Sequence, residues 1–219
     1  MERLSRRVAL LAAALTLAVP AVASAADPIV FVHGWNSSGS TWNTMASRFA
    51  AAGYPSSHLR QWSYNTAQSN ATTAAQLRDE VARVRAATGA AKVDLVTHSM
   101  GGLSSRYYLK NLGGQASVDE WVSIAGPNHG TGTANACFWN TSCYEMRVGS
   151  SFLTALNSGD ETPGDTVRYG TWWSPCDEVI NPDTSTILTG ATNTQTACLS
   201  HSGIKDSATT YSGVAAFVR

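Results

Sequence analysis

The chain has 219 residues, with 15 basic and 15 acidic side chains, no formal net charge and no block of like charge. Nucleic acids and anionic membrane surfaces are bound through clustered basic side chains, so this balance argues against either as the main partner. The length suits one domain with a sizeable core, and neither an internal repeat nor a linker divides the sequence.

Residues 1–25 have the pattern of an export signal. Three arginines within the first seven residues precede a mostly apolar stretch, and Ala-Ser-Ala at 23–25 fits the small-residue rule for cleavage. The cleavage site favours a removed signal over a marginal membrane span. We therefore expect a secreted protein whose mature domain is residues 26–219. Removal of the signal takes away three Arg and one Glu, which leaves 12 basic and 14 acidic residues.

The first half of the mature domain alternates expected strands with expected helices. The apolar run at 28–32 is typical of a buried parallel strand, and the apolar face at 72–88 is the clearest helical pattern. Strands are predicted at 28–32, 59–64, 93–97 and 118–125, and helices at 41–52, capped by Thr41, and at 72–88 and 101–112. This alternation predicts a single α/β domain with a mostly parallel sheet flanked by helices. Ligands of such sheets bind beyond the carboxyl ends of the strands.

The second half is less regular. Residues 126–144 have a loop-like composition, and a short helical turn is expected at 152–156. Strands are predicted at 167–173 and, more weakly, at 194–199, and Asp206 is expected to cap a final helix that runs to about residue 218. A lid over a site is typically a mobile amphipathic helical insertion. No long amphipathic helix is expected between the strands at 118–125 and 167–173, so we predict a lidless domain.

A serine stands at the turn between a predicted strand and a predicted helix. The sequence Thr-His-Ser-Met-Gly at 97–101 fits the G-x-S-x-G elbow except at its first position, where Thr97 is larger than glycine. Such a turn lifts the serine hydroxyl above the sheet and aims the next backbone N–H at an oxyanion. Ser99 is therefore the candidate nucleophile, and Met100 supplies one candidate oxyanion donor. The pentapeptide alone does not separate a catalytic serine from a chance one.

The strand predicted at 28–32 ends at His33-Gly34-Trp35. In serine hydrolases of α/β type, the loop after such a strand supplies the second oxyanion N–H. The Trp35 N–H is the candidate, and Gly34 allows backbone geometry that other residues resist. We expect His33 to have a structural role and to orient this loop by hydrogen bonding.

A serine nucleophile needs a base, and the base needs an orienting carboxylate, in the chain order serine, acid, histidine. Only two histidines follow the candidate nucleophile. His201 lies between the last predicted strand and the last predicted helix, where the base belongs, whereas His129 comes too early and is expected to be structural. Asp177 follows a predicted strand at its carboxyl end and is the favoured acid. Glu178 and Asp183 remain its rivals.

The four cysteines indicate two disulfides, because an even number in an exported chain is typical of disulfide-bonded proteins. Of three possible pairings we favour the short-range one, Cys137–Cys143 and Cys176–Cys198. The second bond would join the loop of the candidate acid to that of the candidate base. A zinc site is disfavoured because the spacings contain no C-x-x-C pair. No other metal or organic cofactor is implied.

These motifs resemble those of the small secreted bacterial lipases of class 2 type, within the α/β-hydrolase fold. The resemblance covers nearly the whole mature chain and rests on VFVHG at 30–34, HSMGG at 98–102, GPNHGT at 126–131, CD at 176–177 and SH at 200–201. It implies hydrolysis of acylglycerol esters through an acyl-enzyme on Ser99, with Asp177 and His201 completing the triad. Some relatives have Ala at the position of Thr97. The resemblance leaves the acyl length open.

Three other functions stay open. A secreted carboxylesterase or polyester hydrolase would use the same triad, and so would an extracellular acyltransferase. A non-catalytic α/β-hydrolase-like binding protein is disfavoured, because such proteins usually lose a triad member and this chain keeps all three. We expect a monomer that binds a lipid or other ester and touches lipid–water interfaces transiently. Trp139, Trp172 and Trp173 could line an acyl groove, touch lipid or pack in the core.

Overall fold

The computed structural model describes residues 26–218, so the predicted signal at 1–25 lies outside the described residues. Six parallel strands form one sheet in the order β2-β1-β3-β4-β5-β6. The strands are β1 (Ile29–Val32), β2 (Leu59–Trp62), β3 (Val93–His98), β4 (Val118–Ile124), β5 (Arg168–Trp173) and β6 (Thr192–Gln195). The order reverses between β1 and β3, which places the expected ligand crevice at their carboxyl ends.

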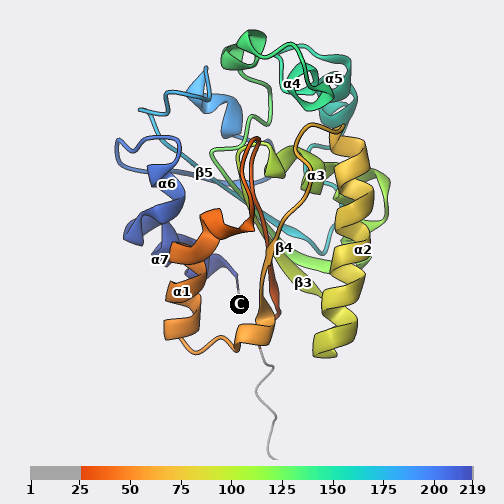
Figure 1. Cartoon of the computed structure of the whole chain (residues 1–219), viewed down its shortest axis with the longest axis vertical. Coiled ribbons are helices and arrows are strands. Elements are labelled where there is room, and N and C mark those ends of the chain that lie inside the picture. The colour runs from red at the N-terminus through yellow and green to blue at the C-terminus, as the bar shows by residue number, and fades with distance from the viewer. Residues whose placement is uncertain (1–25, 219) are drawn as a thin grey trace, which may run out of the picture.

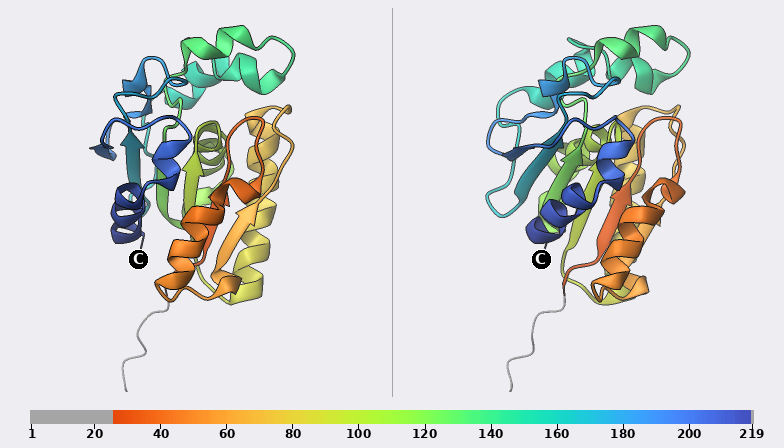
Figure 2. Two further views of the ribbon diagram at one scale, coloured as in Figure 1. Left: turned by 60° about the vertical axis from the view of Figure 1, so that its left-hand side comes forward. Right: turned by 90° about the vertical axis from the view of Figure 1, so that its left-hand side faces the viewer.

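Helices cover both faces of the sheet (Figures 1 and 2). One face carries α2 (Asn70–Thr88) and α3 (Gly101–Asn111), and the other carries α1 (Asn43–Ala51), α6 (Gly203–Asp206) and α7 (Ala208–Phe217). Two short helices, α4 (Thr141–Glu145) and α5 (Ser151–Asn157), lie together above the carboxyl edge of the sheet, at the top of Figure 1. The predicted single α/β domain with a parallel sheet is confirmed.

The alternation of side chains along β1 explains why this strand is apolar throughout. All four of its residues are fully buried. Val30 and Val32 pack with α2 and α3, whereas Ile29 and Phe31 pack with α1 and α7. Successive residues of a strand point to opposite faces, and a parallel sheet with helices on both sides buries both.

The ends of two helices differ from the prediction. A 3-10 turn at Gly39–Trp42 precedes α1, so this helix begins at Asn43 and Thr41 does not cap it. The helix α7 is capped by Ser207, whose hydroxyl accepts from the Thr210 N–H, and not by Asp206. A hydroxyl one residue further along satisfies a free N–H of the first turn, which leaves the Asp206 carboxylate for another partner.

The segment expected to be a loop contains more helix than its composition indicated. A 3-10 turn at Gly132–Ala136 leads to the disulfide Cys137–Cys143 and to α4, which the bond fastens to that turn. Helices of four or five residues are too short to show a clear apolar period, so the sequence pattern did not reveal them. Within residues 26–218, no helix has both the length and the apolar character needed to cross a bilayer.

The side chain of Asp94 is buried in the sheet at the end opposite to the candidate site. Asp94 lies near the start of β3 and is fully buried, and its Oδ1 accepts from the Glu120 N–H at 3.2 Å. The Oδ2 of Asp94 and the Oε2 of Glu120 have no partner in the described part of the chain. Burial, together with the neighbouring carboxyl of Glu120, raises the pKa of Asp94 well above its usual range.

We predict that Asp94→Asn stabilises the protein at pH 8. Because the folded-state pKa is raised, the folded protein retains a proton that the unfolded chain releases, so the wild type loses stability as the pH rises above the unfolded pKa of about 3.9. Asparagine has no proton to bind and does not lose stability with pH in this way, so we expect a gain of at least about 1 kcal/mol of unfolding free energy at pH 8 and a smaller gain at pH 4. Urea denaturation at both values measures the difference. Asp119→Asn, at a half-exposed carboxylate paired with Lys92, is the control and should show no gain that grows with pH. An equal effect of Asp94→Asn at both pH values would contradict the assignment.

Candidate active site

The turn between β3 and α3 holds Ser99 in a backbone conformation that few residues other than glycine adopt. Its φ is +55°, and its N–H donates to the Ile124 carbonyl of the neighbouring strand at 2.9 Å. A Cβ added to Gly101 would lie 2.5 Å from the Val32 carbonyl oxygen, so only glycine lets the helix start this close to β1. The turn therefore raises the serine side chain at the carboxyl edge of the sheet, as the elbow motif predicted.

Thr97, the departure from the elbow motif, is accommodated by a hydrogen bond. Its side chain is fully buried, and its hydroxyl donates to the Val122 carbonyl at 2.7 Å. A buried hydroxyl is costly only when it has no partner, so the carbonyl offsets the cost of this larger residue.

The candidate base and the candidate acid are in contact. His201 Nδ1 lies 2.9 Å from Asp177 Oδ2, and Asp177 Oδ1 accepts from the N–H groups of Val179 and Ile180, each at 2.9 Å. Burial by itself would raise the pKa of Asp177, but the hydrogen bond and charge of His201 together with these two N–H groups hold the pKa below its usual value. The carboxylate is therefore ionised and keeps a proton on Nδ1, which leaves Nε2 as the basic nitrogen.

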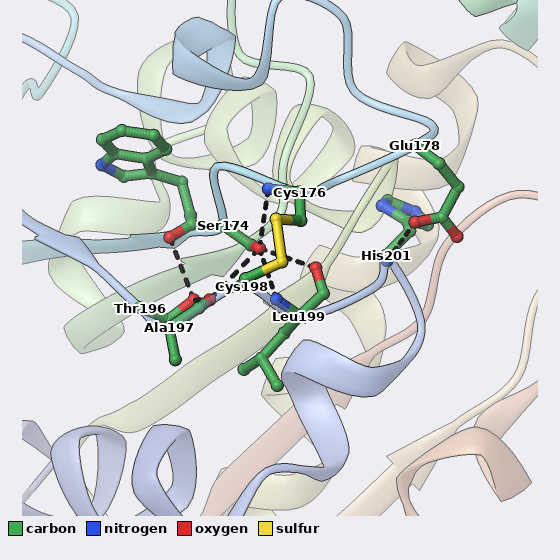
Figure 3. Close-up of a disulfide and its surroundings, with 9 residues drawn as sticks. Ser174, Cys176, Glu178, Thr196, Ala197, Cys198, Leu199 and His201 are labelled. Carbon is green, nitrogen blue, oxygen red and sulfur yellow. Dashed lines mark hydrogen bonds between the residues drawn. A yellow bond between two sulfur atoms is a disulfide. The ribbon is translucent and has the colours of Figure 1, made fainter.

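The two rival acids have other partners. Glu178 Oε2 accepts from the backbone N–H of His201 at 3.0 Å (Figure 3), and no hydrogen bond joins this carboxylate to the imidazole. Asp183 accepts from the N–H of Thr184, the next residue. Of the three carboxylates, only that of Asp177 is bonded to the ring of His201.

A residue that sequence analysis did not single out positions the candidate base. His98 Nε2 donates to the backbone carbonyl of His201 at 2.9 Å, and the two rings lie 4.6 Å apart between centroids. Burial and then the nearby His201 lower the pKa of His98 to about 3, so this ring stays neutral. The only signal in the sequence was its place beside the nucleophile, which does not indicate a partner about a hundred residues away.

A disulfide joins the acid loop to the histidine loop (Figure 3). Cys176 is bonded to Cys198, and Ser174 strengthens the junction beside it. The Ser174 hydroxyl donates to the Leu199 carbonyl at 2.6 Å and accepts from the Leu199 N–H at 2.8 Å. The structure thus contains both short-range pairings that the spacing favoured.

The loop after β1 lies directly against Ser99, the candidate nucleophile. A Cβ added to Gly34 would be 2.7 Å from the Cβ of Ser99. His33 Nδ1 donates to the Gly34 carbonyl at 2.8 Å, and its Nε2 accepts from the Tyr64 N–H at 3.4 Å. In a trans peptide the C=O and the following N–H point in opposite directions, so this hydrogen bond also sets the direction of the Trp35 N–H. His33 has the orienting role expected of it.

Neither of the candidate oxyanion donors is used within the fold. The N–H groups of Trp35 and Met100 have no acceptor among the hydrogen bonds of residues 26–218. Each follows the carboxyl end of one of two adjacent strands, and both residues flank Ser99. Two free N–H groups beside the candidate nucleophile suit the binding of an oxyanion.

Ser99 and His201 line a mostly apolar cavity of about 380 Å³. No direct hydrogen bond between the two side chains is present, which is common in structures without substrate. The apolar walls are formed by Trp35, Ala134, Met146, Val179, Ile180 and the disulfide of Cys137 and Cys143. This lining suits the alkyl part of a ligand. Among the residues described, no group of three or more His, Cys, Asp or Glu side chains could hold a metal ion.

The remaining candidates lie apart from the Ser99 cavity. His129 Nε2 contacts Glu161 at 2.6 Å, consistent with the structural role expected. Trp172 is buried and Trp173 half-buried, whereas Trp139 is 63% exposed. None of the three lines the cavity, and Trp139 is the most exposed of them.

The sequence and the fold match known proteins. The sequence model of the family described as Lipase (class 2) matches residues 26–211. The crystal structure of mature Bacillus licheniformis lipase BlEst2 superposes with a TM-score of 0.77 at 20% identity, over 92% of this chain and 95% of that one. Aspergillus fumigatus lipase B superposes with a TM-score of 0.68 at 17% identity, over 82% of this chain and 49% of that one. Legionella pneumophila phospholipase PlaB superposes with a TM-score of 0.66 at 16% identity, over 87% of this chain and 57% of that one. At these identities, the structural matches show a shared fold.

We predict that removal of the Cys176–Cys198 bond destabilises the protein by about 3 kcal/mol, from the entropy of a loop of its length. The variant is Cys176→Ala/Cys198→Ala, measured by urea denaturation under non-reducing conditions. The matched control is Cys137→Ala/Cys143→Ala, which removes a bond that closes a shorter loop. Its expected loss of unfolding free energy is about 2 kcal/mol. A larger loss in the control would contradict this ranking.

Proposed function

This chain belongs to the class 2 lipase family and is a lipase or ester hydrolase, and we propose that it cleaves acylglycerol esters through an acyl-enzyme on Ser99. One observation carries the proposal. The side chain on the elbow and the imidazole bonded to Asp177 meet at one apolar cavity. That combination supplies a nucleophile, a base and a place for an acyl chain.

The first step is attack of Ser99 Oγ on the ester carbonyl carbon. His201 Nε2 takes the hydroxyl proton as the bond forms, and the carbonyl oxygen becomes an oxyanion. Asp177 keeps the imidazole in the required tautomer and stabilises the imidazolium. The hydrogen bonds of Glu178 and His98 to the backbone of His201 restrict the loop that carries the ring.

The oxyanion is stabilised by the N–H groups of Trp35 and Met100, which are free to donate. Collapse of the intermediate breaks the bond to the alcohol oxygen, which takes the proton from His201 Nε2. Water then attacks the acyl-serine with His201 as base, and the acid departs as Ser99 regains its proton. Because donors fixed by the fold need no reorganisation during the reaction, their effect on the barrier is large.

We propose that Ser99, Asp177 and His201 act as one unit. Ser99→Ala and His201→Ala should each lower kcat for a soluble p-nitrophenyl ester by roughly 10⁴–10⁶-fold, and Asp177→Asn by roughly 10⁴-fold. Glu178→Gln keeps an oxygen acceptor for the His201 N–H, so we expect less than a tenfold loss. Asp183→Asn is the control and should retain near-normal activity. Retention of activity by Asp177→Asn, with loss in either other carboxylate variant, would reassign the acid.

The alternatives share this chemistry and differ in substrate. A series of p-nitrophenyl esters together with an emulsified triglyceride separates a lipase from a short-chain carboxylesterase, and a polyester film tests the third. Acyl transfer is detected as a new ester when an alcohol is added. A non-catalytic binding protein would turn over none of them.

The chain also presents exposed apolar side chains in a segment that contributes to the cavity lining. Its four exposed large hydrophobic side chains among the described residues all fall within one segment, namely Phe138, Trp139, Tyr144 and Val148. This segment contains the disulfide and Met146, which line the cavity. Aromatic side chains favour lipid–water interfaces. We therefore propose that this segment adsorbs to the surface of aggregated ester.

We propose that adsorption occurs without a lid movement and outside the cell. The helices over the cavity, α4 and α5, have five and seven residues, and a disulfide fastens the first. The cavity over Ser99 is present with both helices in place. Two disulfides are typical of exported proteins, which agrees with the predicted signal at 1–25.

We predict that Phe138→Ser/Trp139→Ser weakens adsorption to a triglyceride emulsion by tenfold or more, because each side chain can bury apolar area worth roughly 2 kcal/mol. Rates on the emulsion should fall accordingly. Neither residue lines the cavity, so hydrolysis of dissolved tributyrin should change little. Equal losses on both substrates would argue against adsorption. A wild-type enzyme that is inactive on tributyrin until droplets form would show that the 126–157 segment closes the site.

A further inference from the structure

A second cavity opens on the same serine. It has a volume of about 200 Å³ and lies between the loop after β1 and the start of α6. Ser99, His201, Trp35 and Asn36 line both cavities, so both are adjacent to an ester on the serine. The lining of the second cavity is polar where that of the first is apolar, with the side chains of Asn36, Ser37, Thr41, Ser202 and Lys205.

Lys205 is the unusual member of this lining. Its side chain is only 7% exposed, although lysine is almost never buried without a partner. Its Nζ donates to Asp206 Oδ2 at 2.7 Å. An ammonium group has three N–H donors, and the other two have no acceptor among the described residues. These donors are available to a group bound in the cavity.

The charges favour a hydroxyl group over an anion. The Asp206 carboxylate beside Nζ repels an approaching phosphate or carboxylate. Arg48 lies nearby, but its Nη1 is bonded to the Asp206 carbonyl at 2.7 Å. The hydroxyl and amide side chains of the lining both donate and accept, as an alcohol hydroxyl does, whereas a phosphate oxygen only accepts.

We infer that this cavity binds the leaving alcohol and that Lys205 determines specificity there. It selects neutral esters whose alcohol carries free hydroxyls near the scissile oxygen, as in mono- and diacylglycerols, while the acyl chain occupies the apolar cavity. The inference rests on the proposed ester hydrolysis. The selection occurs because a hydroxyl that accepts from Nζ gains a charge-assisted hydrogen bond that an alkyl group cannot form.

The test compares two dissolved esters of one acid, 2,3-dihydroxypropyl hexanoate and propyl hexanoate, which differ only in two hydroxyls. We expect wild-type kcat/KM to favour the first by about tenfold or more, the effect of one hydrogen bond to a charged group. Lys205→Met should lower this ratio by about tenfold. Lys92→Met is the matched control, because Lys92 is also paired with an aspartate, Asp119, but does not line the cavity. Its ratio should equal that of the wild type.

Three further measurements keep the inference open to refutation. Ser202→Ala, at an exposed position, should lower the ratio of kcat/KM for the two hexanoate esters by roughly threefold. This variant replaces Lys205→Met if the latter does not fold. Hexyl acetate places the long chain in the alcohol, so it should be a poorer substrate than propyl hexanoate. A 3-phosphate of the glyceryl ester should also be poorer than the neutral ester.

Each outcome decides between the two proposals. An unchanged ratio in both variants, or hexyl acetate or the phosphate ester as the best substrate, would overturn the subsite while leaving ester hydrolysis intact. Failure of the wild type on every ester would overturn the proposed function itself. Active-site titration of each variant separates loss of folded protein from loss of preference.

Discussion

The contact between the loop after β1 and the turn after β3 is the constraint on which the site depends. The two strands are neighbours with Val32 opposite Thr97, so their loops leave the sheet side by side. Gly34 faces the Ser99 side chain, and Gly101 faces the Val32 carbonyl, each with no room for a Cβ. This close approach alone brings together the N–H groups of Trp35 and Met100 and the hydroxyl of Ser99. Glycine at both positions is therefore required by packing, and neither has a positive φ.

The histidine reaches this place from near the end of the chain, and several independent contacts hold it. Its ring is bonded to Asp177, its N–H to Glu178 and its carbonyl to His98. The Cys176–Cys198 bond limits the separation of the acid and histidine loops. Each contact fixes a different atom of one residue, so the direction of the imidazole is determined by the acid loop, the nucleophile turn and the disulfide together.

The sequence predicted strands β1 to β5 and the order of the candidate triad, because apolar runs and turn motifs are local signals. The weak prediction at 194–199 overlaps β6 by two residues only. It did not predict what depends on distant partners. The hydrogen bond of His98 joins residues far apart in the chain, and Lys205 followed by Asp206 has the pattern of an ordinary surface ion pair. The helix α4 is too short for a periodic signal and is fastened by a disulfide. The predicted cap of α7 differs from the observed one by one residue because Asp206 and Ser207 are both good cap residues. Only the structure shows that the Asp206 carboxylate accepts from Lys205 while Ser207 caps the helix.

The two cavities that meet at Ser99 also bear on the order in which products leave. The residues that line both are Trp35, Asn36, Ser99 and His201, so in the proposed binding mode an alcohol in one cavity does not have to pass an acyl chain in the other. Under the proposed mechanism, a hydroxylated alcohol retained beside the acyl-serine competes with water for the same carbonyl carbon. The lifetime of that alcohol in the proposed subsite would then set the partition between hydrolysis and return of the acyl group, so the polar lining would control reversibility as well as selection.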